Sequence, residues 1–164
     1  MKVALIMGSD SDFPALKPTV RVLKDFGIEC DVNVISAHRS PKRAEDFSKN
    51  AKDNGYGVLI CAAGKAAHLA GVMAANTALP VIGIPMKSST MDGLDSLLSV
   101  VQMPKGIPVA TVAIDGAENA ALLAVQILAV NDVDLYKKLL KYKQKMAEDQ
   151  LIKDAEIKAA AAEI

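Results

Sequence analysis

Residues 3–12 are VALIMGSDSD, a run of apolar side chains that ends abruptly at a glycine followed by four small polar residues. A short continuous apolar run is typical of a strand that is covered on both faces. The polar turn at residues 8–12 then leads into a helical stretch, which we expect to end near Phe26 with Gly27 as its stop. This strand, turn and helix predict an α/β protein.

The same alternation of strand and helix continues along the chain. Further strands are predicted at residues 31–35, 57–61, 81–84 and 109–114, and helices at residues 41–54, 66–77 and 117–130, the first of them with Ser40 as N-cap. Five strands that alternate with helices imply a parallel sheet with helices on both faces. We expect a flavodoxin-like, three-layer α/β/α fold with strand order 2-1-3-4-5.

The C-terminal part of the chain predicts contacts between subunits. Residues 117–130, AENAALLAVQILAV, are apolar almost all round, which indicates burial on more than one side. From Asp132 onward the tail has the pattern of one long helix, roughly 45 Å in length. We therefore expect residues 1–130 to form a single catalytic domain, and residues 131–164 a helical extension that packs on neighbouring subunits of a homo-oligomer.

Composition excludes several classes of partner. Nineteen basic and nineteen acidic side chains cancel, and no basic stripe predicts a nucleic-acid partner. The apolar segments are too short or too interrupted to span a membrane, and no signal peptide is visible. Cys30 and Cys61 have the pattern of reduced core thiols, so a cytoplasmic location is expected. No Cys/His cluster has metal-ligand spacing, so no metal site is expected.

The only two histidines, His38 and His68, each follow a predicted strand. Ligands bind beyond the carboxyl ends of the strands in an open parallel sheet, and imidazole is the side chain whose ordinary pKa lies nearest neutrality. We interpret the pair as proton-transfer groups that act on a small molecule. Capping or packing histidines are the alternative.

Two polar turns suit a phosphorylated ligand. The hydroxyls and helix-start N–H groups of residues 8–12 suit an anion, and Asp12 can accept hydrogen bonds from ribose hydroxyls. Arg39 stands beside His38 just before a predicted helix, where the guanidinium and the helix dipole would together hold a phosphate. Helix capping and a solvated arginine are the alternatives. Neither a GxGxxG fingerprint nor a P-loop is present, since Leu59 and Ala66 occupy P-loop positions that need other residues.

Five segments together resemble the N5-carboxyaminoimidazole ribonucleotide mutase family of de novo purine synthesis: MGSDSD, SAHRSP, AAHLAG, GLDSLLSVVQMPKGIPVATVAI and NAALLAVQILA. They occur in the family's order between Val3 and Val130. The resemblance implies a flavodoxin-like domain in a homo-octamer without metal or organic cofactor. It also implies a reaction that moves a carboxylate from the exocyclic N5 of the ribonucleotide to ring carbon C4, giving 4-carboxy-5-aminoimidazole ribonucleotide.

The resemblance also implies roles for individual residues. Proton transfer falls on His38, and a second active-site histidine is His68. Substrate contacts fall on Ser9, Ser11, Asp12, Ser36, Arg39 and Gly64. In the implied mechanism the carbamate loses carbon dioxide, which stays trapped beside the aminoimidazole. The ring carbon C4 attacks it, and a histidine then removes the C4 proton.

The chain departs from the family's usual loop GAGGAAHLPG, because Lys65 replaces a glycine and Ala70 a proline. We expect Lys65 to point to solvent; the alternative is a positive charge near the carboxylate. The related carboxylase branch, which takes carbon dioxide directly, lacks the AAHL pattern. The mutase is therefore favoured over an aminoimidazole ribonucleotide carboxylase and over a non-catalytic nucleotide-binding module.

Overall fold

The computed structural model describes residues 1–164, and its strands form one parallel sheet in the order β2-β1-β3-β4-β5. The strands are β1 (Lys2–Met7), β2 (Cys30–Val34), β3 (Tyr56–Ala63), β4 (Val81–Pro85) and β5 (Ala110–Thr111). All neighbouring pairs are parallel. The predicted flavodoxin-like topology is therefore confirmed.

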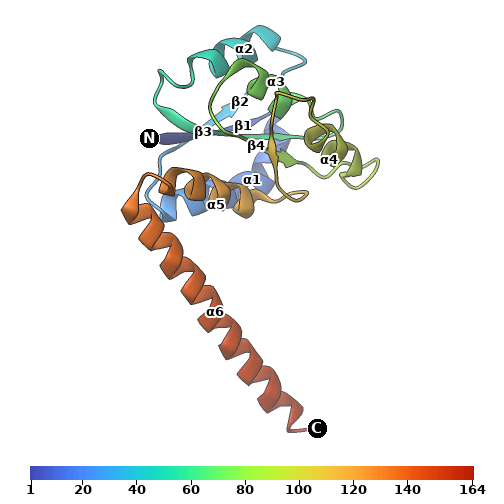
Figure 1. Ribbon diagram of the computed structural model, residues 1–164. Coiled ribbons are helices and arrows are strands. Elements are labelled where there is room, and N and C mark those ends of the chain that lie inside the picture. The colour runs from blue at the N-terminus through green and yellow to red at the C-terminus, as the bar shows by residue number, and fades with distance from the viewer.

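Helices cover both faces of this sheet. The helical elements of the whole chain are the short 3₁₀ turn η1 (Asp10–Asp12), α1 (Phe13–Asp25), α2 (Pro41–Asn50), α3 (Leu69–Asn76), α4 (Leu94–Val101), α5 (Ala117–Ala129) and α6 (Val133–Ala161). Figure 1 shows α1 and α5 below the sheet and α2 and α3 above it, which makes three layers. None of these helices combines the length and apolar composition needed to cross a membrane.

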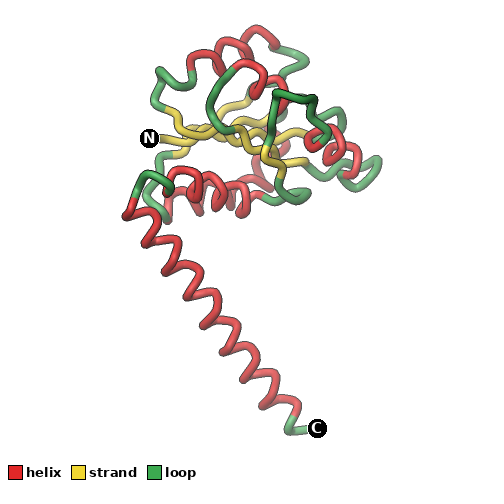
Figure 2. The backbone as a smooth tube through the Cα atoms, in the orientation of Figure 1, coloured by secondary structure: helices red, strands yellow, loops and turns green.

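The last helix, α6, extends far from the sheet, as the backbone trace shows (Figure 2). Asp132 caps it, because its carboxylate accepts hydrogen bonds from the N–H groups of Asp134 and Leu135. All residues from Gln150 to the C-terminus are exposed in the single chain. The predicted long C-terminal helix is thus confirmed.

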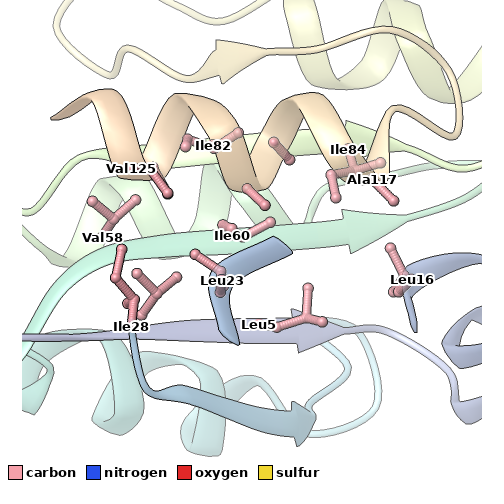
Figure 3. Close-up of a cluster of buried hydrophobic side chains, with 14 of the residues drawn as sticks. Leu5, Leu16, Leu23, Ile28, Val58, Ile60, Ile82, Ile84, Ala117 and Val125 are labelled. Carbon is pink, nitrogen blue, oxygen red and sulfur yellow. The ribbon is translucent and has the colours of Figure 1, made fainter. Parts of the chain in front are cut away.

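The larger core cluster lies between the sheet and the α1–α5 layer (Figure 3). Leu5 and Ile60 point from the central strands toward Leu23 of α1 and Val125 of α5, and all four side chains are fully buried. The buried hydroxyl of Thr19 donates to the carbonyl of Ala117 at 2.8 Å, which joins the two helices. Burial of this apolar layer holds the sheet rigid beneath the turns that follow its strands.

The strand register brings three of those turns to one edge. Met7 pairs with Val34 of β2 and with Ala62 of β3, so the three strands end at nearly the same level. The turns after β1, β2 and β3 therefore begin side by side, as the predicted strand order requires.

Several predicted boundaries were wrong. The strand predicted at residues 109–114 pairs only over Ala110–Thr111, because the carbonyl of Ala113 closes a turn with the N–H of Gly116. The helix predicted from residue 66 begins at Leu69, since Lys65 adopts a left-handed conformation with φ 55° and a turn follows it. The helix α4 was not predicted.

The start of α2 also differs from the prediction. Ser40 occupies the N-cap position, but its side chain does not cap the helix. Its hydroxyl instead donates to the carbonyl of Ser36 at 2.9 Å, which closes the preceding turn. The helix ends at Asn50 rather than near residue 54. A series of turns at residues 51–55 then leads into β3.

Candidate active site

A cavity of about 600 Å³ lies at the carboxyl ends of the central strands. Its lining comes from four segments, residues 8–12, 36–39, 63–69 and 87–89, which follow β1, β2, β3 and β4 respectively. All eight site residues predicted from the sequence line it: Ser9, Ser11, Asp12, Ser36, His38, Arg39, Gly64 and His68. The fold therefore brings together side chains that lie up to 59 positions apart in the chain.

The two histidines contact each other directly. Nε2 of His38 lies 2.8 Å from Nδ1 of His68, and the rings meet edge to face with an interplanar angle of 85°. His38 comes from the turn after β2, and His68 comes from the turn that precedes α3. The cavity wall thus carries a hydrogen-bonded imidazole pair that is open to solvent and able to exchange protons with a ligand.

Arg39 fixes the relation between the turns after β1 and β2. Its Nη2 donates to the carbonyl of Gly8 at 2.8 Å, and its backbone N–H donates to Oγ of Ser36 at 3.2 Å. The side chain lies at the cavity rather than over solvent alone, and it retains further N–H donors for a ligand. A guanidinium held in this way suits a phosphate or a carboxylate.

Hydroxyl groups and one carboxylate occupy the wall that follows β1. Oγ of Ser9 and Oγ of Ser11 are 2.8 Å apart, and Ser9 also accepts the N–H of Ser11 at 3.3 Å. Burial raises the pKa of Asp12, and the nearby Asp115 carboxylate raises it further, while a hydrogen bond from Ser11 lowers it. Asp12 is therefore a carboxylate whose charge the surrounding protein groups stabilise poorly and which gains from hydroxyl donors on a ligand.

The charge of the cavity favours an anion. Three cationic residues, Arg39, Lys65 and Lys87, line it, and Asp12 is the one acidic residue that does. No three His, Cys, Asp or Glu side chains lie close enough together to hold a metal ion. The two cysteines are free, and burial raises the pKa of Cys61, which leaves its thiol unreactive.

The chain matches the family described as AIR carboxylase over residues 2–149. It belongs to this family. It is 55% identical over 145 residues to the N5-carboxyaminoimidazole ribonucleotide mutase of Pyrococcus abyssi, covering 88% of this chain and 83% of that protein. It is 49% identical over 152 residues to the protein of the same name from Thermotoga maritima, covering 93% and 89%.

Two further matches of this AIR carboxylase family chain differ in how much of the other protein they cover. The phosphoribosylaminoimidazole carboxylase of Saccharomyces cerevisiae is 50% identical over 151 residues, which cover 92% of this chain but 26% of the yeast protein. The crystal structure of Treponema denticola PurE superposes with a TM-score of 0.86 at 28% identity, covering 94% of this chain and 96% of that one.

Sequence reasoning missed one wall of the cavity in this family member. Lys87, Ser88 and Ser89 line it, and they directly follow β4. The signal was present, because the rule that selected the turns after the first three strands applies equally to the fourth. Lys65 also lines the cavity, at the left-handed backbone position after Gly64.

Proposed function

We propose that this chain is a mutase that moves the carboxylate of N5-carboxyaminoimidazole ribonucleotide from N5 to C4 in de novo purine biosynthesis. The observation that carries the proposal is the contact between His38 and His68, on the wall of a cavity that hydroxyl and cationic residues also line. Relatives named as mutases, which this chain matches at about half of all positions over most of both lengths, support it.

Each end of the ribonucleotide has groups in the cavity that match its chemistry. The hydroxyls of Ser9, Ser11 and Ser36, with the Arg39 guanidinium, would bind the 5′-phosphate through neutral and charge-assisted hydrogen bonds. Asp12 would accept the ribose hydroxyls. Gly64 has no side chain, so the backbone of its turn can approach the flat aminoimidazole ring.

The imidazole pair can both supply and take back the proton that the proposed reaction needs. When the bond from N5 to the carboxylate carbon breaks, its electron pair stays on N5, and an imidazolium gives N5 a proton as carbon dioxide leaves. C4 then forms a bond to that carbon dioxide, and the neutral imidazole removes the C4 proton so that the ring regains its aromaticity. One proton leaves the histidine pair and one returns, so the isomerisation needs no net proton from water.

The test compares two substrates, with product formation followed by ultraviolet absorbance. One sample holds the N5-carboxylated ribonucleotide without added bicarbonate, and the other holds aminoimidazole ribonucleotide with saturating carbon dioxide. We expect much faster turnover in the first. Faster turnover in the second would place the chain in the direct carboxylase branch, and no turnover in either would favour a non-catalytic nucleotide-binding module.

The proposal includes a homo-octamer in the cytoplasm, in which residues 1–130 form the catalytic domain and residues 131–164 pack on neighbouring subunits. Exposed apolar side chains on α6 support this, since Leu151 and Ile157 are each 70% exposed in the single chain. An apolar groove where α5 meets α6, lined by Val130 and Tyr136 among others, adds to this surface. Light scattering that gave a mass near 17.3 kDa would contradict the assembly.

A further inference from the structure

Asp115 makes an unusual contact with the strand β4. Its N–H donates to the carbonyl of Pro85 at 2.9 Å, and its Oδ1 accepts the N–H of Lys87 at 2.9 Å. In a parallel sheet, a residue donates its N–H to the carbonyl of the residue before its partner, and its own carbonyl accepts the N–H of the residue after its partner. Here the carboxylate of Asp115 takes the place of that carbonyl.

The backbone conformation of Asp115 explains why its carboxylate, and not its carbonyl, accepts the Lys87 N–H. Its φ of 54° is a left-handed conformation, which an aspartate tolerates better than most residues. This conformation turns the carbonyl away from β4 and toward the N–H of Ala117, which donates to it at 2.7 Å at the start of α5. The side chain is therefore the only group of Asp115 left to receive the Lys87 N–H.

The segment held by this bond is the wall that follows β4. Lys87 and the two serines after it line the cavity, whereas Asp115 is not among the lining residues. The neighbouring Met86 is fixed on its other side, because its N–H donates to Ala63 at 2.9 Å and its carbonyl accepts the hydroxyl of Ser96 at 2.7 Å. Ser88 is held as well, since its hydroxyl donates to Oδ1 of Asp95 at 2.8 Å. Between these two anchors, the Asp115 carboxylate is the group that holds the backbone N–H of Lys87.

We propose that Asp115 is a positioning residue for the ribonucleotide, because its carboxylate replaces its own carbonyl in the sheet ladder and so fixes the backbone of Lys87 in the cavity wall. The inference rests on the proposed function for the identity of the ligand. Its contact with Lys87 is exposed, so water can replace the carboxylate in a variant. Loss of the contact should therefore affect ligand binding more than folding.

The test uses the full chain and a graded pair of variants that both tolerate a left-handed backbone. Asp115→Asn keeps a weaker oxygen acceptor, and Asp115→Gly removes it. We expect KM for the N5-carboxylated ribonucleotide, and Kd for aminoimidazole ribonucleotide measured by calorimetry, to rise about two- to three-fold for Asn and about tenfold for Gly. We expect kcat to stay within about two-fold, since a lost ground-state contact raises KM alone.

Asp92→Gly is the matched control. Asp92 is also an aspartate with a left-handed backbone, φ 52°, but it reaches only the Lys87 side-chain Nζ, at 3.4 Å, and makes no hydrogen bond to the Lys87 backbone. We expect its KM to stay within about two-fold of wild type. Equal KM values for wild type and both Asp115 variants would overturn the inference. A melting temperature that falls in the variants in proportion to the rise in their KM would overturn it as well.

The outcomes also separate this inference from the proposed function. In one outcome, the wild type binds aminoimidazole ribonucleotide but does not convert the N5-carboxylated substrate, and the Asp115→Gly variant binds aminoimidazole ribonucleotide about tenfold more weakly. That outcome would overturn the mutase and support the positioning role. An active wild type with unaffected variants would overturn the positioning role alone. A wild type that neither binds nor converts the ribonucleotide would overturn both.

Discussion

Nε2 of His38 and Nδ1 of His68 share a single proton across their 2.8 Å contact, since one nitrogen must donate and the other accept. The contact joins two turns that follow different strands, so its geometry depends on the sheet rather than on local sequence. A proton can therefore pass from one ring to the other without movement of either backbone. This relationship makes the two imidazoles one acid–base unit in the proposed reaction.

Replacement of His38 by asparagine should remove proton transfer while keeping a polar side chain of similar extent. We expect kcat to fall by about 10²–10⁴-fold, the usual contribution of a general acid–base group. Binding of aminoimidazole ribonucleotide, measured by calorimetry, should change only a few-fold. Near-normal turnover in this variant would show that the catalytic role of His38 is wrong.

Arg39→Ala should weaken binding instead. The guanidinium would make charge-assisted contacts in both the ground state and the transition state, so its loss raises Kd and KM by about 10- to 100-fold and leaves kcat within a few-fold. Arg43→Ala is the control, because Arg43 lies four residues further along, in α2, and donates to the carbonyl of Val34 at 3.2 Å but does not line the cavity. Equal effects of the two substitutions would contradict the phosphate role of Arg39.

Asp12→Asn should stabilise the folded chain at neutral pH while weakening ribonucleotide binding. Burial, followed by the neighbouring Asp115 carboxylate, raises the pKa of Asp12 above its ordinary 3.8, so the folded state holds this proton more tightly than the unfolded state. The stabilising contribution is complete below pH 3.8 and is lost as the pH rises through the folded-state pKa. At pH 7 the ionised group therefore costs stability.

Thermal melts of wild type and Asp12→Asn at several pH values check this. We expect the variant to melt at the higher temperature at pH 7, and the difference to shrink as the pH falls toward 4. A variant that melted below wild type at pH 7 would show that the ionised carboxylate stabilises the folded chain. The gain in stability should accompany a higher KM, because the ribose hydroxyls lose a charged acceptor.

Lys65→Gly should leave mutase turnover within a few-fold, because Lys65 is exposed although it belongs to the turn that lines the cavity. Its φ of 55° is a conformation that glycine adopts without steric cost, so we expect the free energy of unfolding to stay equal or rise by up to about 1 kcal/mol. Urea denaturation and a steady-state assay measure the two effects. A tenfold loss of turnover would instead assign Lys65 a contact with the substrate carboxylate.

The strongest patterns in the sequence predicted the sheet well. Residues 3–7 and 81–84 were assigned to strands within one residue of their observed ends, because buried parallel strands are short, continuous apolar runs. The strand predicted at residues 109–114 was too long, since apolar side chains continue past Thr111 while the backbone turns at Ala113. Val112 and Ile114 are half-buried and Ala113 is exposed, so an apolar stretch of sequence can continue where the hydrogen-bond ladder stops.

The site was predictable as a set of turns but not as a set of contacts. The strand order placed His38 and His68 at one edge, but it did not show that Lys65 adopts a left-handed backbone and that α3 starts only after His68. A lysine gives no sequence signal for such a conformation. The role of Asp115 was likewise hidden, because an aspartate after a strand predicts a turn rather than a substitute for a backbone carbonyl.

All residues that line the cavity belong to the first 89 positions, whereas α5, which supplies much of the core under the sheet, begins at Ala117. During synthesis on the ribosome, the whole set of ligand-facing side chains emerges before the helix that packs beneath them. The bond from Thr19 to Ala117 cannot form until that helix has left the exit tunnel. We therefore expect a nascent chain to carry the residues of the site before α5, which contributes no lining residue, can pack beneath the sheet and complete the larger core cluster.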